Sequence, residues 1–531
     1  MGRLLYGGKI YTMTGPNETV EAIYIENGKI VATGKLDQLK DRFANQIEQD
    51  IELQGTIFPG FIDSHLHIIG HGEKLLRLDL SQVQSRQEVI HKISEAASVV
   101  KDGDWLIGEG FNENNWDDPI MIHRKELDEV SNGHPVVLTR VCRHALVANS
   151  KAMELSGVSE KTENVSGGVI ERDFYGHLTG AFHDQAQELI KEYMPIPDLN
   201  YLKKAVKTSI QDLLSKGIVS GHSEDLSYYG GFKQTYDAFK EVIPEDQQFR
   251  AHLLVHHEVV DDLHREGHKP QQQDDWLEFG AMKLFVDGAL GGRTALLSEP
   301  YSDDPTTDGV AIHSDEALEE LVLKARQYHM PIAVHAIGDL ALEKIVNLIE
   351  QYPPPQGMKD RLIHGQIMRP DLIKRLKNKP VIIDIQPLFV SSDFPWVIER
   401  VGEKRANESY PWKSYLKEGL LCAGGSDAPI ESVEPLLSID AAVNRRSAYD
   451  GHVYNSEECL SIYEAIELYT VNPAKVIGKE HIQGKIAEGY YADFVILDQD
   501  PFQINKDELH KIKVLNTIVN GEIVYSNDDH M

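Results

Sequence analysis

The chain has 531 residues, of which 41% are hydrophobic and 26% are charged, as in an ordinary soluble globular protein. Acidic residues outnumber basic residues by 84 to 53, which gives a net charge of −31. Because a nucleic-acid backbone or an anionic membrane binds cationic surface, this charge argues against both as partners.

The cysteines and the apolar runs bear on the compartment. The three cysteines, Cys142, Cys422 and Cys459, have neither the number nor the spacing of a disulfide framework or a cysteine zinc site. The first ten residues lack the apolar segment of a signal peptide. No apolar run reaches the roughly 18 residues that a membrane span needs. We therefore expect a cytoplasmic protein.

Both ends of the chain contain short segments of β type. They comprise residues 9–12, 19–25 and 29–34 near the N-terminus, and residues 492–497, 514–519 and 522–525 near the C-terminus. Asn27-Gly28 and Asn520-Gly521 are hairpin turn signals between such segments. Because chain termini often lie close together, we expect one small β-sandwich domain built from residues 1–55 and 477–531.

The middle of the chain, residues 56–476, alternates apolar runs with amphipathic helical stretches, a pattern typical of a parallel α/β fold. The apolar runs cover residues 56–67, 217–222, 249–255, 279–287, 331–335, 361–364, 381–386 and 420–427. Eight such units predict a (β/α)₈ TIM barrel. The first two runs are too far apart for one connection, so we expect residues 70–200 to form an insertion beside the barrel mouth, with strands near 104–110 and 135–141.

His65 and His67 lie two residues apart at the end of the first apolar run. Side chains at i and i+2 on a strand point to the same face, so these two imidazoles can share a metal ion. Taken alone, the pair is a weak signal, because a short motif is only a hypothesis, and a half-buried strand that carries two hydrogen-bonded histidines is the more common alternative.

Polar side chains also occur in or at the end of later runs. Lys283 lies in the fourth run, His335 ends the fifth, His364 ends the sixth and Asp427 ends the eighth. A buried ionisable group is costly unless it is paired or bound to metal. Since active sites of TIM barrels lie at the carboxyl ends of the strands, these positions predict one metal centre for metal-assisted hydrolysis.

These motifs resemble those of the amidohydrolase superfamily, and within it the amidohydrolase-3 branch of N-substituted formamide deformylase-like metal-dependent hydrolases. The matching segments are residues 59–67 (PGFIDSHLH), 283–294 (KLFVDGALGGRT), 335–339 (HAIGD), 364–365 (HG), 426–429 (SDAP), 464–474 and 484–495. The resemblance covers nearly the whole chain.

The resemblance implies a role for each residue of the predicted metal centre. His65 and His67 would bind a first metal ion, and His335 and His364 would bind a second. Asp427 would contact the first ion and its water, take a proton from that water, and return it to the leaving nitrogen as general acid. The ion, most simply zinc although iron suits the same ligands, would lower the pKa of its water enough to form hydroxide.

Lys283 matches the fourth-strand lysine whose carbamate bridges two metal ions in many relatives. An ammonium has no lone pair, so Lys283 can be a ligand only if it is carboxylated or deprotonated. The alternative is a lysine that forms an ion pair with Asp287 or Asp427. One or two metal ions therefore remain open.

Three residues are candidates for contact with substrate. His144 belongs to a motif, Arg143-His144 through Asn149-Ser150, that lies near the mouth in the family, but a surface loop histidine is an equal alternative. Arg293 lies on the glycine-rich loop after the fourth run and can bind a carboxylate or pair with Glu299. His222 ends the second run, where relatives often carry His-Asp, whereas here the acid, Glu224, comes two residues later.

Two further groups have simpler expected roles. Asp339 can either orient His335 or cap the following helix, and we favour the cap. His256 and His257 are neighbours, and neighbouring residues on a strand face opposite sides, so we place both in a loop.

The predicted function is hydrolysis of a carbon–nitrogen bond, in a non-peptide amide, N-acyl or N-formyl compound of small size. Hydrolysis of an ester, lactone or phosphoester on the same scaffold is the first alternative, and a metal-binding barrel without turnover is the second. The sequence leaves the substrate and the oligomeric state open, and a homo-oligomer is compatible with it.

Overall fold

The computed structural model describes residues 2–101, 103–140, 145–165, 168–269 and 274–527. They form two compact units, one composed of Met1–His71 and Leu202–Met531 and the other of Gly72–Tyr201. The second unit coincides closely with the segment predicted to be an insertion, residues 70–200. Each unit has its own sheets and its own core.

The larger unit contains the predicted barrel. Its eight strands are β5 (Phe61–Leu66), β12 (Ile218–Ser223), β13 (Arg250–His256), β14 (Leu277–Phe285), β15 (Ile332–Ala336), β16 (Asp360–His364), β17 (Val381–Ile385) and β18 (Leu421–Gly424). They pair in parallel in the order β18-β17-β16-β15-β14-β13-β12-β5, so each strand lies beside its neighbour in the chain. Nearly every residue of these strands is buried, which explains why they read as continuous apolar runs.

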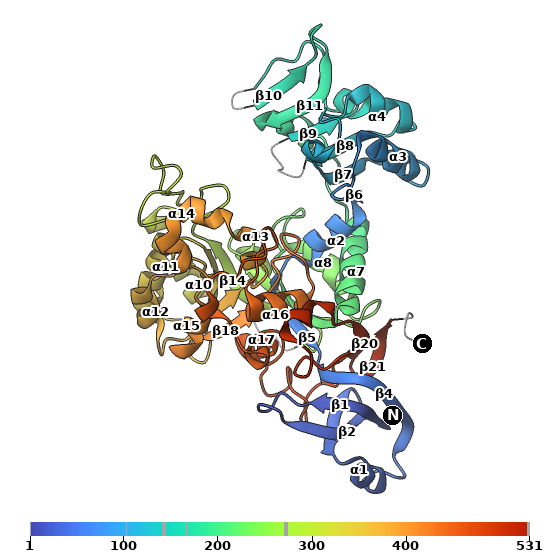
Figure 1. Ribbon diagram of the computed structural model, residues 1–531, viewed down its shortest axis with the longest axis vertical. Coiled ribbons are helices and arrows are strands. Elements are labelled where there is room, and N and C mark those ends of the chain that lie inside the picture. Colours follow the sequence, from blue (N-terminus) through green and yellow to red (C-terminus); the bar gives the residue numbers. More distant parts are fainter. Residues whose placement is uncertain (1, 102, 141–144, 166–167, 270–273, 528–531) are drawn as a thin grey trace. The chain divides into compact units, whose positions relative to one another are not determined.

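Helices surround the barrel strands (Figure 1). They are α7 (Leu199–Ser215), α8 (Phe232–Val242), α9 (Val260–Arg265), α10 (Asp315–Gln327), α11 (Asp339–Gln351), α12 (Pro370–Leu376), α13 (Phe389–Asp393), α14 (Trp396–Asn407), α15 (Trp412–Lys417), α16 (Pro435–Asn444), α17 (Ile462–Glu467) and α18 (Val471–Val476). Helix α2 (Ile68–Leu76) follows β5 and leads into the smaller unit. No helix in the described residues is long and apolar enough to cross a membrane.

Both chain ends contribute to one seven-stranded sheet, in the order β21-β20-β19-β4-β1-β2-β3. Its strands are β1 (Gly2–Tyr11), β2 (Thr19–Glu26), β3 (Lys29–Gly34), β4 (Ile47–Pro59), β19 (Phe494–Leu497), β20 (Val514–Val519) and β21 (Glu522–Ser526), and helix α1 (Leu36–Arg42) follows β3. Residues 56–59 belong to β4 and pair with β19, so the predicted first barrel strand starts too early. The hydrogen bonds define a single sheet, and a two-sheet sandwich stays a prediction.

The smaller unit is built on a six-stranded sheet in the order β10-β11-β9-β8-β7-β6. The strands are β6 (Leu78–Asp79), β7 (Leu106–Phe111), β8 (Val136–Arg140), β9 (Ala145–Ala148), β10 (Gly168–Arg172) and β11 (Leu178–Asp184), and the helices are α3 (Arg86–Ala97), α4 (Arg124–Val130), α5 (Ser150–Leu155) and α6 (Glu188–Lys191). Neighbouring residues of β8 enter different clusters, since Val136 and Leu138 pack in one and Val137 in the other. This alternation shows that both faces of the sheet are covered.

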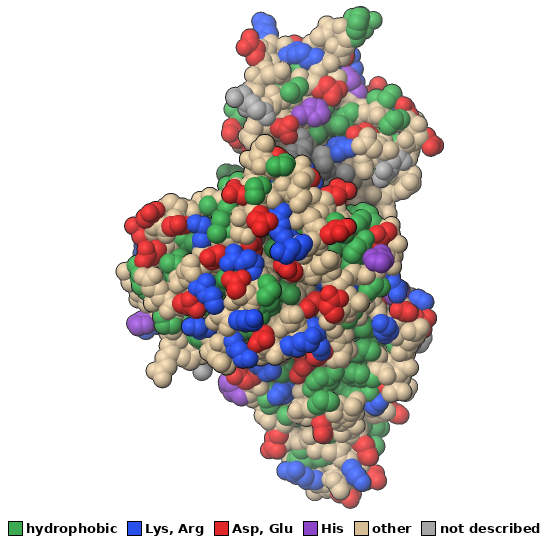
Figure 2. Space-filling view, turned by 60° about the vertical axis from the view of Figure 1, so that its left-hand side comes forward, with side chains coloured by type: hydrophobic (Ala, Val, Ile, Leu, Met, Phe, Trp, Pro, Cys, Tyr) green, Lys and Arg blue, Asp and Glu red, His purple; other side chains and the backbone are tan. Residues whose placement is uncertain are grey.

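The acidic excess is not gathered in one place on the face that Figure 2 shows. On the face shown in Figure 2, acidic and basic side chains are interspersed over the surface, although acidic residues outnumber basic ones by 84 to 53 in the chain. This face has no broad cationic surface of the kind that binds a nucleic-acid backbone.

Candidate metal centre

The predicted metal ligands meet at the carboxyl ends of the barrel strands. His65 lies on β5, and His67 directly follows that strand. Lys283, His335 and His364 come from β14, β15 and β16. Asp427 lies three residues beyond β18 and has a positive φ of 56°, so it is in a turn and not at a strand end as expected. Parallel strands bring these distant residues to one edge.

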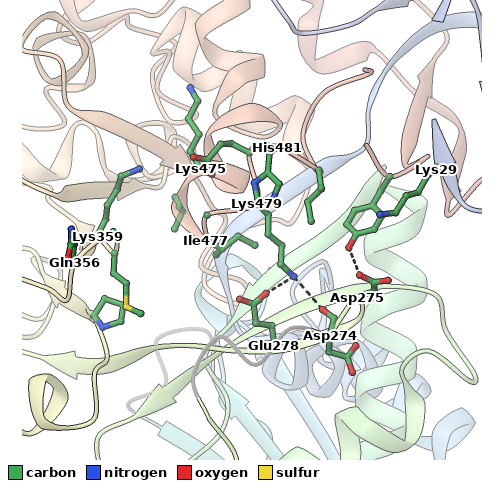
Figure 3. A pocket seen from close by; sticks show the side chains of 18 residues that line it. Lys29, Asp274, Asp275, Glu278, Gln356, Lys359, Lys475, Ile477, Lys479 and His481 are labelled. Carbon is green, nitrogen blue, oxygen red and sulfur yellow. Dashed lines mark hydrogen bonds and ion pairs between the residues drawn. The ribbon is translucent and has the colours of Figure 1, made fainter. Parts of the chain in front are cut away.

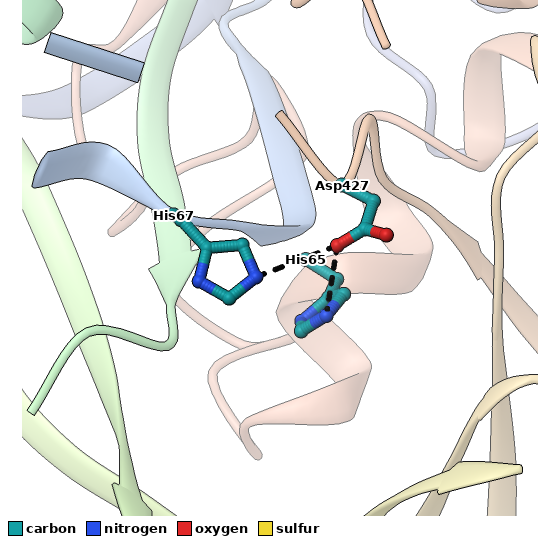
Figure 4. Close-up of side chains that lie close together, drawn as sticks. All are labelled: His65, His67 and Asp427. Atoms are coloured by element: carbon teal, nitrogen blue, oxygen red, sulfur yellow. Dashed lines mark ion pairs between the residues drawn. The ribbon is translucent and has the colours of Figure 1, made fainter. Parts of the chain in front are cut away.

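His65, His67 and Asp427 form the first half of the centre (Figure 4). Oδ1 of Asp427 lies 3.4 Å from Nε2 of His65 and 3.5 Å from Nε2 of His67. Ligands at 2.0–2.1 Å from one tetrahedral zinc ion are about 3.3–3.5 Å apart, so this spacing fits a shared ion. Among the described residues, no other group of three His, Cys, Asp or Glu side chains has ligand atoms all within 4.8 Å of one another.

Backbone hydrogen bonds fix this half. The amide of Asp427 donates to the carbonyl of His65 at 2.8 Å, and the amide of His67 donates to the carbonyl of Ala428 at 2.8 Å. The buried carboxylate of Asp63 accepts from the amide of His65 at 2.9 Å and from that of Ser426 at 3.1 Å. These bonds join the first strand of the barrel to the turn after the last strand, and they place the three ligands together.

A further contact orients the ring of His67. Its Nδ1 lies 2.5 Å from the carbonyl oxygen of Glu224. A carbonyl can only accept, so Nδ1 donates to it, and Nε2, which faces Asp427, is the nitrogen left for a metal ion. Binding of a metal ion there would displace the proton that Asp427 and Glu224 otherwise favour on this ring.

His335 and His364 form the second half of the centre. Nε2 of His335 lies 3.0 Å from the carbonyl of Gly288, and Nδ1 of His364 lies 2.7 Å from Oε1 of Gln386. Both of these nitrogens must donate, so the other nitrogen of each ring carries a lone pair. Those two nitrogens face each other at 3.1 Å. Two lone pairs at this distance repel each other unless a cation lies between or beside them, so the pair also fits a metal ion.

Lys283 lies between the two halves and is 1% exposed. Its Nζ is 3.4 Å from Nε2 of His65 and 4.0 Å from Oε2 of Glu224. The expected ion-pair partners were Asp287 and Asp427, but the nearest carboxylate is Glu224. Asp287 instead accepts three backbone amides, from Leu296 at 2.8 Å, Ile337 at 3.0 Å and Gly338 at 2.8 Å. These bonds tie together the loops after β14 and β15.

The electrostatics of the centre favour a cation. Burial lowers the pKa of His65, His335 and His364, and the charge of Lys283 lowers it further, although Asp427 partly offsets this at His364, so these rings are neutral and have a lone pair to offer a metal ion. Burial also lowers the pKa of His67, but Asp427 and Glu224 outweigh burial and raise it to about 9. For Asp427, burial raises the pKa, but His67, His364 and Lys283 outweigh burial and lower it, so the carboxylate is ionised. The two carboxylates thus attract positive charge to the space beside His67.

Of the three candidates for substrate contact, His144 lies outside the described residues, and the structure does not bring the other two, Arg293 and His222, into this cluster. Nε and Nη2 of Arg293 donate to Asp303 at 3.1 and 2.8 Å. The partner of Arg293 is therefore Asp303 and not Glu299, the alternative expected from the sequence. His222 is fully buried, and its ring packs on that of His252 with centroids 5.0 Å apart. It precedes Glu224 by two positions, so it faces the barrel interior one layer below the ligands.

Two simpler expectations are also corrected. Asp339 neither contacts His335 nor caps the helix, because Gly338 is the cap residue and the Asp339 carboxylate accepts from the amide of Ser298 at 2.9 Å. His256 is the last residue of β13 and is buried, so it is not in a loop. Its neighbour His257 follows the strand.

The structure also brings in three residues that the sequence did not single out as site residues. Glu224 and Tyr228 border the first half, and the hydroxyl of Tyr228 donates to Oε2 of Glu224 at 2.8 Å. Gln386 orients His364 in the second half. A signal was available for both Glu224 and Gln386, since Gln386 ends a predicted strand and Glu224 comes two residues after another, which the structure extends to Ser223.

Known proteins resemble this chain over nearly its whole length. The model of the amidohydrolase family matches residues 53–525. The chain is 48% identical over 529 residues to the putative amidohydrolase YtcJ of Bacillus subtilis, and covers 99% of each chain. It is 25% identical to the N-substituted formamide deformylase of Arthrobacter pascens, covering 98% of each. The crystal structure of an uncharacterized metal-dependent hydrolase from Pyrococcus furiosus superposes with a TM-score of 0.81 at 29% identity, covering 95% of this chain and all of the other.

Proposed function

The chain belongs to the amidohydrolase family and is a metal-dependent hydrolase, and we propose that it cleaves carbon–nitrogen bonds in small molecules. The substrates would be non-peptide amides, N-acyl or N-formyl compounds, which is supported by the likeness to an N-substituted formamide deformylase. The observation that carries the proposal is the shared spacing of His65, His67 and Asp427, with His335 and His364 turning two lone pairs toward the same space.

The residues that would hold the metal are His65, His67 and Asp427 for one ion, and His335 and His364 for a second. When bound, the metal supplies Lewis-acid polarisation of the carbonyl group and activation of a water molecule. Zinc is the proposed metal, since histidine and carboxylate ligands at this spacing suit it. Lys283 would complete a two-ion centre as a carbamate, for which its burial between His65 and Glu224 provides the position.

Asp427 is the proposed proton carrier. Its ionised carboxylate lies in contact with both histidines of the first half, so it can accept a proton from the attacking water. The same proton then goes to the leaving nitrogen, which departs as a neutral amine. The bond between the acyl carbon and nitrogen breaks, while the carbon gains the hydroxyl group of water.

The geometry disfavours phosphoesters among the alternatives. A phosphoryl group calls for cations that neutralise its oxygens. Lys283 is the only lysine or arginine among the described residues of the proposed centre. Arg293 forms an ion pair with Asp303. Esters and lactones need no added cation, so they belong in any substrate panel. A barrel without turnover would be expected to lack a ligand or Asp427, and this chain retains all of them.

The test combines metal analysis with a substrate panel. The purified protein is assayed for bound metals and for the added mass of a carbamate, and then for hydrolysis of N-formyl, N-acyl, ester, lactone and phosphoester compounds. We expect one or two zinc ions per chain and turnover of N-formyl or N-acyl compounds. A metal-loaded protein that cleaves only the oxygen esters would refute the proposed bond class. Three predictions remain. The substrate panel tests a small molecule as the main partner, cell fractionation tests a cytoplasmic location, and light scattering measures the oligomeric state.

A further inference from the structure

The barrel interior below the metal centre is unusually polar. His222 on β12, His252 on β13, Arg361 on β16 and Asp384 on β17 are all buried, with at most 6% of each residue exposed. The interior of a TIM barrel is normally filled by branched apolar side chains. We call these four residues the polar layer.

Several atoms of the polar layer have no hydrogen-bond partner within the protein. They are Nδ1 of His252, Nη1 of Arg361, Oδ1 of Asp384 and the ring nitrogens of His222, for which the backbone of Ser64 is a nearby partner but makes no well-formed hydrogen bond. Buried polar atoms in native proteins are almost always hydrogen-bonded, and buried water satisfies those that the protein leaves unpaired. The polar layer therefore offers several hydrogen-bond partners to buried water.

The polar layer reaches the metal centre at its upper end. Arg361 donates from Nε to Asp384 at 2.7 Å and from Nη2 to the carbonyl of Ser64 at 2.6 Å. Ser64 directly precedes the ligand His65, whose Nδ1 is also buried without a partner in the protein. A polar route thus runs along β5 and β12 to the first metal ligand.

The lower end of the polar layer reaches a pocket at the other end of the barrel. Nδ1 of His252 lies 4.0 Å from Oε1 of Glu278, and Glu278 pairs with Lys479 at 2.5 Å. Figure 3 shows this ion pair in the wall of a cavity of about 590 Å³. The cavity is also lined by Asp274, Pro331 and Lys359, which precede β14, β15 and β16, so it opens at the amino-terminal ends of the strands.

The rest of the interior has a different character. Leu254, Ala281, Ala333 and Ile363 form an apolar cluster on β13 to β16. Gly280 leaves room beside His252, because a Cβ at that position would lie 2.0 Å from Nε2 of the ring. Leu254 and Ile363 lie two residues beyond His252 and Arg361 on the same strands, so above the polar layer β13 and β16 are apolar and the polar residues that continue toward the metal centre are on β5 and β12.

The polar layer is suited to water and not to a second metal group. Its residues do not meet the three-ligand spacing that His65, His67 and Asp427 meet among the described residues. Burial, followed by the charge of Arg361, lowers the pKa of His222 and His252, so both rings are neutral. A neutral imidazole has one donor and one acceptor, as a chain of water molecules requires.

We propose that ordered water fills the polar layer and that this column is a passage through which water reaches the metal centre from the amino-terminal end of the barrel. The passage rests on the proposed function, because hydrolysis consumes one water molecule in each turnover. A substrate bound at the carboxyl ends leaves the opposite end of the barrel free, so the consumed water is replaced from there.

The first test is structural and thermal, and it needs no substrate. A high-resolution crystal structure of the full chain should show ordered water bonded to His222, Arg361 and Asp384. His222→Leu should lose these waters and lower the Tm, because Arg361 and Asp384 lose their bridging partners, whereas His222→Gln should retain both. An apolar control, Leu254→Met, should change neither. A dry layer, together with a higher Tm for His222→Leu, would overturn the proposal, since that variant removes unpaired nitrogens from a dry site.

The second test is kinetic. With metal content and KM unchanged, His222→Leu should lower kcat by about tenfold, equivalent to about 1.4 kcal/mol in the barrier, and His222→Gln should restore it. Unchanged turnover in His222→Leu would rule out a passage. If the wild-type protein hydrolyses nothing in the panel, the proposed function fails, while the crystallographic and thermal results still decide whether the layer is hydrated.

Discussion

The two halves of the metal centre hold their ligands in different ways. In the first half, His65, His67 and Asp427 are fixed by backbone hydrogen bonds between the first strand and the turn after the last, and Asp427 supplies a negative charge. In the second half, His335 and His364 are neutral rings, each oriented by one acceptor. Since only the first half carries its own anion, we expect it to bind metal more tightly, and we expect the second half to depend on a carbamate at Lys283.

Replacement of Asp427 should have the largest effect. Asp427→Asn keeps the shape but removes the proton acceptor, so we expect kcat to fall by about 10²- to 10⁴-fold. Activity is measured on protein whose metal content is determined in the same preparation. Asp303→Asn, which changes a carboxylate at the Arg293 ion pair, is the matched control and should retain activity. Wild-type turnover in fully loaded Asp427→Asn would remove the proposed role.

Two buried carboxylates allow each half to be weakened separately. Asp63→Ala removes the acceptor for the amides of His65 and Ser426, so affinity for the first ion should fall by about 10- to 100-fold. Asp287→Ala removes the acceptor for the amides of Ile337 and Gly338, which follow His335, so affinity for the second ion should fall. Competition with a chromogenic chelator measures both affinities. Equal losses of both ions in both variants would show that the halves are not independent.

A smaller effect is expected from Gln386. Gln386→Leu leaves Nδ1 of His364 without its acceptor, so the ring is no longer held with Nε2 toward His335. We expect affinity for the second ion to fall by about tenfold, with the first ion unaffected. Gln386→Glu retains an acceptor and should restore binding. Loss of the first ion instead would contradict the assignment of His364 to the second half.

The smallest effect is expected from Arg293. Its guanidinium is bound to Asp303, and Asp303 also contacts Arg400, so Asp303 keeps a cation when Arg293 is removed. Arg293→Gln should therefore leave metal content, Tm and KM unchanged. A large rise in KM would show that Arg293 exchanges Asp303 for a substrate carboxylate, and would return it to the substrate site.

Much of this architecture could be predicted because parallel strands have a distinct sequence signature. Strands buried on both faces are continuous apolar runs, and a polar residue that follows such a run stands out, as at His335 and His364. One strand boundary was nevertheless predicted wrongly. Residues 56–59 are as apolar as the following barrel strand, and no sequence pattern reveals that they pair with β19 instead.

The partners of individual side chains were harder to predict than the strands. Lys283 meets Glu224 and not Asp287, because β12 and β14 flank β13 in the sheet although they lie far apart in the sequence. Asp287 looked like a charge partner, but it accepts backbone amides from two loops. A residue type and its position on a strand predict the layer in which it lies, whereas the choice of partner within that layer depends on three-dimensional packing.

The hydrogen bonds that place Asp427 beside His65 have a consequence for the stability of the whole barrel. They join the first barrel strand to the turn after the last, which are more than three hundred residues apart in the chain. A metal ion that binds both sides of this junction acts as a cross-link between the two ends of the barrel. By mass action, such a ligand stabilises the folded state in proportion to RT ln(1 + [M]/Kd), so the heat resistance of this enzyme should follow the free metal concentration around it.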